Sequence, residues 1–137
     1  MRLFLGWCKL NQAHHLPASV PDVVRFVTDN SNISPDLMHA ELTAIDEEHE
    51  ALLYAPPGKA RAVIKAVNAA WPIDAPRSWP AEDKGRFAEL PHHLQVYLER
   101  REKQRDQAVR DAQNEAAELR KKLKKFEEAN AETKTAA

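Results

Sequence analysis

Between Pro91 and the last residue the chain has neither proline nor glycine, and this feature most constrains its fold. Proline and glycine are the residues that most often end or bend helices, so one long helix is predicted over residues 91–130. Most of its residues are charged or polar, and the few larger apolar side chains recur in steps of three and four, the spacing of a coiled-coil seam. The seam comprises Val109, Ala112, Ala116, Leu119, Leu123 and Phe126.

This seam is short, about two and a half heptads, and its alanines bury little apolar area. Extended toward the N-terminus, the same register meets Arg105 and Glu102, which end it. We therefore predict that the helix self-associates through the seam or packs against a helical partner. Residues 131–137 have no large apolar side chain to bury and are expected to be disordered.

Residues 1–70 hold most of the aliphatic side chains, in helical patterns. No alternating strand pattern occurs, so the predicted fold class is all-α. Ser19 and Ser34 are typical N-caps, the second followed by proline, and further helices are expected over 2–11 and 58–70. The helix after Ser34 is expected to bury one stripe: Leu37, Met38, Leu42, Ile45, His49, Leu52 and Leu53.

A proline-rich stretch separates these two parts. Residues 71–90 are predicted to be a linker containing one short helix, which begins at Trp79-Pro80 and ends near Leu90. The predicted division is therefore a four-helix bundle (1–70), a linker (71–90), a long charged helix (91–130) and a tail (131–137).

Composition excludes several kinds of site. Three glycines are too few for a glycine-rich phosphate-binding loop, and one cysteine forms neither a disulfide framework nor an all-cysteine metal centre. The histidines are adjacent pairs or far apart, which is not metal-site spacing. No cofactor, metal or small-molecule substrate is therefore expected. No apolar stretch reaches the roughly 18 residues of a membrane helix, so no membrane contact is expected. With one unpaired cysteine and no recognisable export signal, a cytoplasmic location is expected.

Three further features are interpreted as structural. His49 lies on the apolar stripe and is expected to be a hydrogen-bonded core residue. Cys8 follows Trp7 in an apolar helix and is expected to be buried, because a reactive thiol needs an open, electropositive setting. The acidic run over residues 46–50 is expected to be a solvated helix face, since adjacent carboxylates point in different directions.

A series of motifs runs through residues 3–68: Phe4-Leu5-Gly6-Trp7-Cys8, Leu16-Pro17-Ala18-Ser19, Val23-Val24-Arg25-Phe26-Val27, Ile33-Ser34, Leu42-Thr43-Ala44-Ile45 with His49, and Pro57. Their order and spacing resemble the N-terminal core-binding domain of tyrosine recombinases, the phage-type integrases. In that family a helix ends in Phe-x-x-Trp-Cys, Leu-Pro-Ala-Ser follows, and a serine-capped helix contains Ala-Ile-x-x-x-His.

The resemblance implies a small SAM-like bundle of four helices that clamps duplex DNA, with the Ala-Ile-x-x-x-His helix facing the DNA. This chain departs from the family on that helix, where Asp36, Glu41 and residues 46–48 are acidic and would repel phosphates. It also lacks the family's catalytic domain, with its Arg/His/Arg cluster and tyrosine nucleophile. The chain is therefore not expected to be an enzyme.

Basic residues are the candidates for nucleic-acid contact, although the formal net charge of −1 gives the chain no global basic field. DNA binding by the bundle requires its basic residues to share one face. In the long helix, interleaved acidic residues make salt-bridged solvation the alternative interpretation. The candidates are Arg2, Lys9, Arg25, Lys59, Arg61 and Lys65 in the bundle, and Arg120, Lys121, Lys122, Lys124 and Lys125 in the long helix.

Two functional hypotheses follow. The first is a non-catalytic accessory or remnant protein of the tyrosine-recombinase type, with a DNA-proximal bundle, duplex DNA as partner and an oligomerising helix. The second is a structural assembly or adaptor protein without nucleic-acid binding. Segments near Trp79 and Phe87 are similar to parts of some phage structural and scaffolding-type proteins. In both hypotheses the long helix pairs with a second copy or with another helical protein.

Overall fold

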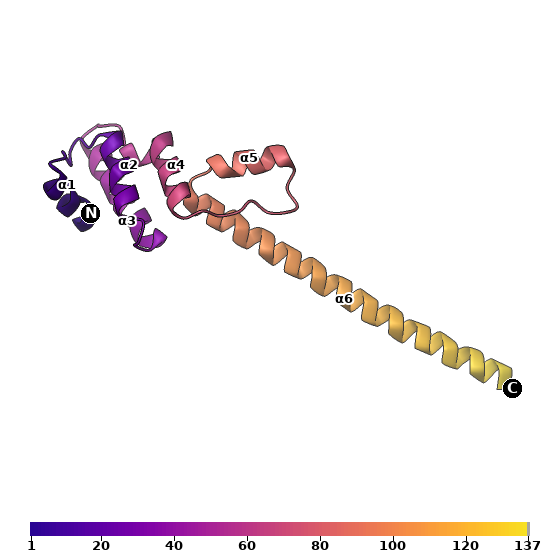
Figure 1. Ribbon diagram of the computed structural model, residues 1–137. Coiled ribbons are helices and arrows are strands. Elements are labelled where there is room, and N and C mark those ends of the chain that lie inside the picture. Colours follow the sequence, from indigo (N-terminus) through magenta and orange to yellow (C-terminus); the bar gives the residue numbers. More distant parts are fainter. Residues whose placement is uncertain (137) are drawn as a thin grey trace. The chain divides into compact units, whose positions relative to one another are not determined.

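The computed structural model describes residues 1–136, and every regular element among them is helical. This confirms the predicted all-α class (Figure 1). The chain divides into two compact units, an N-terminal unit (Met1–Leu98) and a C-terminal unit (Glu99–Ala137). In chain order the elements are α1 (Arg2–Asn11), α2 (Val20–Asp29), α3 (Pro35–Ala51), the 3₁₀ turn η1 (Pro57–Lys59), α4 (Arg61–Ala70), α5 (Ala81–Glu89) and α6 (His92–Ala136).

The core of the N-terminal unit is formed by α1, α2, α3 and α4. Three aromatic rings lie at its centre: Phe26 meets Phe4 edge-to-face with ring centroids 5.1 Å apart, and Trp7 in the same manner at 5.9 Å. Aromatic pairs with this geometry add to the stabilisation that burial provides. The buried apolar residues are Phe4, Trp7, Cys8, Val23, Phe26, Val27, Met38, Leu42, Ile45 and Val63.

Serine caps begin α2 and α3, as the sequence predicts. The Ser19 hydroxyl accepts a hydrogen bond from the Asp22 N–H at 3.2 Å, and the Ser34 hydroxyl accepts one from the Leu37 N–H at 3.2 Å. Each bond satisfies one of the backbone donors that the first turn of a helix leaves without a partner. These two helices therefore begin where local side-chain chemistry predicts.

The apolar stripe of α3 is shorter than predicted. Met38, Ile45 and His49 are buried, but α3 ends at Ala51, and Leu53 is 95% exposed. Leu53 has a φ of 62°, and the Tyr54 N–H donates to the His49 carbonyl at 2.9 Å. A left-handed residue with this hydrogen bond is a common helix end, and it turns the chain away before leucines 52 and 53 reach the core. Leu37 is also exposed.

Glu41 is buried, although the sequence suggests an exposed carboxylate on an acidic surface. Its Oε2 accepts the Phe4 N–H at 3.2 Å, and its Oε1 lies 3.0 Å from the Met1 amino nitrogen. Met1 precedes α1 without a side-chain cap of its own, so a residue of α3 supplies the acceptor there. A carboxylate at a helix N-terminus also interacts favourably with the helix dipole.

The stretch predicted as a linker, 71–90, belongs to the N-terminal unit together with the first turns of α6. Trp71 packs against the core, and Phe87 is almost fully buried beside Trp79, with ring centroids 5.6 Å apart. Side chains from outside α5 satisfy carbonyls at its end. Asn68 donates to the Ala88 and Leu90 carbonyls at 3.2 and 2.8 Å, and Gln95 donates to the Phe87 carbonyl at 2.8 Å. The predicted short helix is therefore present, and the compact unit continues through this stretch to Leu98.

Helix α6 continues past the predicted end at Asn130 to Ala136, so the disorder predicted for 131–136 is wrong; Ala137 lies outside the described residues. Alanine, glutamate and lysine are strong helix formers, and extending an existing helix needs no new nucleus. The hydroxyls of Thr133 and Thr135 donate to the carbonyls of Ala129 and Ala131, both at 2.9 Å.

Candidate functional site

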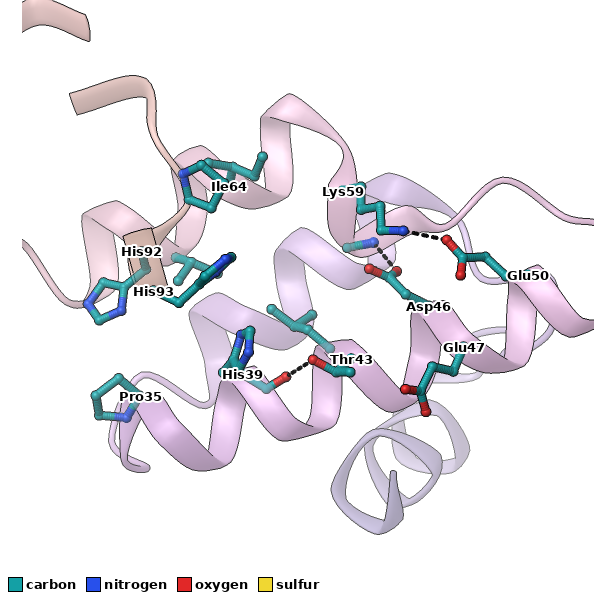
Figure 2. Close-up of a pocket in the computed structure, with 14 residues that line it drawn as sticks. Pro35, His39, Thr43, Asp46, Glu47, Glu50, Lys59, Ile64, His92 and His93 are labelled. Carbon is teal, nitrogen blue, oxygen red and sulfur yellow. Dashed lines mark hydrogen bonds and ion pairs between the residues drawn. The ribbon is translucent and has the colours of Figure 1, made fainter. Parts of the chain in front are cut away.

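A pocket of about 430 Å³ lies in the N-terminal unit, between α3, the η1–α4 segment and the start of α6. Apolar side chains of Leu42, Ile64 and Val67 form much of its wall. Polar groups gather at two ends: histidines at one, and carboxylates with a lysine at the other (Figure 2). Apolar walls with a few polar groups are typical of a site that binds a small molecule or a peptide side chain.

Three histidines form the first end of this pocket. The rings of His39 and His93 are 5.0 Å apart, and His92 meets Trp71 edge-to-face at 6.5 Å. Burial lowers the pKa of both His92 and His93, and the neighbouring His39 lowers both pKa values further. Among the residues that the structure describes, no group of three or more His, Cys, Asp or Glu side chains is arranged to hold a metal ion.

The lowered pKa values make the stability of this unit depend on pH. In the unfolded chain these imidazoles titrate near their ordinary pKa of 6.5, so the unfolded state binds protons first as the pH falls. We expect the melting temperature, followed by tryptophan fluorescence, to decrease progressively below about pH 6.5. His92→Gln with His93→Gln should reduce this decrease. The matched control, His14→Gln with His15→Gln at exposed positions, should keep the full decrease of the melting temperature. If both variants reduced this decrease equally, its assignment to His92 and His93 would be contradicted.

Asp46 lies at the second end and is 9% exposed, so the prediction of a solvated face over 46–50 is wrong for this residue. Its Oδ1 accepts the Gly58 N–H at 2.6 Å, and Lys59 pairs with Glu50 beside it. Burial raises the pKa of the Asp46 carboxyl, although the Gly58 N–H and the Lys59 ammonium act in the opposite direction. A Cβ on Gly58 would lie 2.6 Å from Asp46 Oδ2, so glycine allows this close approach.

The basic residues predicted to contact DNA come from several elements of the N-terminal unit. Arg2 and Lys9 belong to α1, whereas Arg61 and Lys65 belong to α4, and these helices flank α2 and α3 on opposite sides (Figure 1). Arg61 also pairs with Glu89 at 2.9 Å, and Lys59 pairs with Glu50. Scattered and partly neutralised cations make a weak phosphate-binding surface.

Arg25, the sixth candidate of this unit, has a structural environment. Its guanidinium lies over the Trp7 ring, 5.3 Å from the centroid, and Nη1 lies 3.5 Å from Asp22 Oδ1. Stacking of this kind holds an arginine against the protein surface. Arg25 therefore covers the Trp7 side of the core.

The second basic set lies on α6, where all five side chains are exposed. Lys121 pairs with Glu118 at 3.1 Å and Lys124 lies 3.9 Å from Glu128, both within the helix. This agrees with the salt-bridged interpretation for these two lysines. The full set is Arg120, Lys121, Lys122, Lys124 and Lys125.

The predicted seam lies on the same helix and is uncovered in a single chain. Val109, Leu119, Leu123 and Phe126 are 49–65% exposed, Ala112 is exposed and Ala116 is half-buried. Large aliphatic and aromatic side chains are seldom left exposed at regular helical spacing without a partner.

His49 and Cys8 both have the structural environments predicted from the sequence. His49 is 1% exposed; its Nε2 accepts the Ala18 N–H at 2.8 Å, and its Nδ1 lies 2.6 Å from the Ile45 carbonyl oxygen. An accepting Nε2 leaves the ring proton on Nδ1, where it is donated to that carbonyl. Cys8 is buried, and burial raises the pKa of its thiol, which disfavours the reactive thiolate.

The pocket was missed by sequence reasoning because its lining comes from three separated segments. The burial of Asp46 could have been predicted only by combining two features of the sequence: a carboxylate on the inner side of α3 and, after two prolines, a glycine whose N–H that carboxylate could accept.

Among the described residues, no helix combines the length and the apolar character needed to cross a membrane. Comparison of the chain with protein-family models, with curated proteins and with solved structures finds no match.

Proposed function

We propose that this chain is an assembly adaptor: α6 joins copies of the chain through its seam, so that each assembly presents more than one N-terminal unit. The observation that carries the proposal is the exposure of the seam. Its larger side chains recur at heptad spacing on a helix that runs from His92 to Ala136 without interruption. Pairing with a second helix would remove this apolar area from water.

The distribution of positive charge favours the adaptor over a DNA-binding accessory protein of the recombinase type. Clamping duplex DNA needs several lysines or arginines on one surface, because phosphate contacts supply most of the affinity. Here the candidates of the N-terminal unit lie on helices at opposite sides of α2 and α3, and three of them have acidic partners. Burial of Glu41 and Asp46 removes two carboxylates from the surface but brings no cations together.

Two aspartates in the seam test the proposal. The wild-type chain is expected to show, by light scattering, a mass that rises with concentration above the monomer mass of 15.5 kDa. Leu119→Asp with Leu123→Asp should hold the mass at the monomer value, because paired helices would have to bury unpaired carboxylates. Gln104→Asp with Asn114→Asp adds the same charge at exposed positions off the seam and should behave as wild type. A wild-type chain that stays monomeric at every concentration overturns the proposal.

A DNA titration separates the two functions. Fluorescence anisotropy of a labelled duplex, measured from about 50 to 200 mM salt, should show no salt-sensitive binding by the wild-type chain. Binding that weakens steeply across this range would favour the accessory protein of the recombinase type instead. Arg2→Ala with Lys65→Ala would then show whether the N-terminal unit supplies the phosphate contacts.

A further inference from the structure

The charged residues beside the seam of α6 carry information about how two copies would pair. The steps of three and four assign Val109, Ala116 and Leu123 to position a of the heptad, and the other three seam residues to position d. The positions that flank a coiled-coil seam, e and g, then follow. Position g is occupied by Arg101, Ala108, Glu115 and Lys122, and position e by Asp106, Gln113, Arg120 and Glu127.

We propose that two copies of α6 form a parallel, in-register, two-stranded coiled coil; this rests on the self-association proposed above. In that arrangement each g residue faces the e residue five positions later on the partner helix. Three of the four resulting pairs have opposite charges: Arg101 with Asp106, Glu115 with Arg120, and Lys122 with Glu127. The fourth, Ala108 with Gln113, is uncharged. The occupant of the seam is therefore a second copy of this chain.

The ion pairs within α6 support this assignment. Lys121 pairs with Glu118, and Lys124 with Glu128, all at positions away from the seam. Within the described chain, by contrast, no ion pair forms at Glu115, Arg120, Lys122 or Glu127, the four charged residues that flank the central part of the seam. These four residues, which have no ion pair in their own chain, are the ones that a parallel second copy would pair around the central part of the seam.

An antiparallel pair matches the charges less well. If Val109 of one helix lies opposite Phe126 of the other, the apolar layers still align. Asp106 then lies beside Glu127 of the second helix, which places two negative charges together. Glu115 still meets Lys122 in this arrangement, a difference that the experiment below uses.

Asn130 occupies the next a position after Leu123. An asparagine at one a position favours two strands in register, because the two amides hydrogen-bond each other across the seam and are left without partners when the helices slip. This position lies within α6, in the part that the sequence suggested would be near the helix end.

Exchanging two g charges distinguishes the orientations. In a parallel pair, Glu115→Lys with Lys122→Glu turns both contacts with Arg120 and Glu127 into like-charge contacts, at unchanged net charge. The dimer dissociation constant from sedimentation equilibrium should rise at least about tenfold at low salt. In an antiparallel pair residues 115 and 122 still carry opposite charges and face each other, so the constant should not change.

A second exchange provides the matched control. Adding Arg120→Glu and Glu127→Lys restores opposite charges at both contacts and should return the dissociation constant to the wild-type value. An exchange at g that leaves dimer formation unaffected, or a wild-type assembly with the mass of a trimer, overturns the parallel two-stranded arrangement but not the adaptor. A wild-type chain without self-association overturns the adaptor itself, so the two failures are distinguishable.

Discussion

Replacing Ile45 with aspartate is expected to unfold the N-terminal unit at room temperature. Ile45 is 0% exposed and lies in the core. An unpaired carboxylate at such a site costs several kcal/mol, a large part of the roughly 5–15 kcal/mol that stabilises an ordinary domain. All three tryptophans, Trp7, Trp71 and Trp79, lie in this unit, so tryptophan fluorescence reports its unfolding separately from α6.

Leu53→Asp is the matched control for this substitution. Leu53 follows α3 and is 95% exposed, so the same change of an aliphatic residue to aspartate should leave the tryptophan melting curve unchanged. Helicity from α6 should remain in the circular dichroism of both variants. An Ile45→Asp chain that melts like wild type would show that this face of α3 does not contact the core.

Replacing Phe26 with alanine is the second substitution with a large expected effect. Phe26 is fully buried, and its ring meets both Phe4 and Trp7 edge-to-face. Removal of a buried phenylalanine ring costs about 3–5 kcal/mol, because apolar burial is lost and a cavity remains. The free energy of unfolding, measured in urea by tryptophan fluorescence, should fall by this amount.

Phe126→Ala makes the same chemical change at an exposed position of α6. It should leave the unfolding free energy of the N-terminal unit unchanged while weakening self-association. A loss below about 1 kcal/mol at Phe26 would mean that the core closes around the missing ring, and that its packing is looser than the ring geometry indicates.

Features set by neighbours along the chain were predictable from the sequence. The hydroxyls of Ser19 and Ser34 each accept a hydrogen bond from the backbone N–H three residues later. Because both partners of this bond lie in one short segment, the start of the helix follows from the local sequence. The long helix after Pro91 was predictable for the same reason, since its residues are strong helix formers and no breaker interrupts them. Its seam was predictable because the apolar residues recur in steps of three and four along the sequence.

The features that sequence reasoning missed depend on partners far away in the chain. Glu41 accepts a hydrogen bond from Phe4, 37 residues earlier, and Asp46 accepts one from Gly58, 12 residues later. The sequence around a helical carboxylate looks the same whether the carboxylate faces water or accepts a hydrogen bond from a backbone N–H of another segment. The pocket was missed for this reason, because its two polar ends exist only after α4 and the start of α6 pack on α3.

The short helix α5 ends on hydrogen bonds from side chains that are not its own. Asn68 and Gln95 donate to the carbonyls of Phe87, Ala88 and Leu90. A backbone carbonyl is present whatever side chain its residue carries, so the exposed positions of α5 are free to change during evolution without loss of these bonds. The evolutionary constraint is transferred to two polar residues outside α5, and we expect Asn68 and Gln95 to be retained while most of α5 diverges.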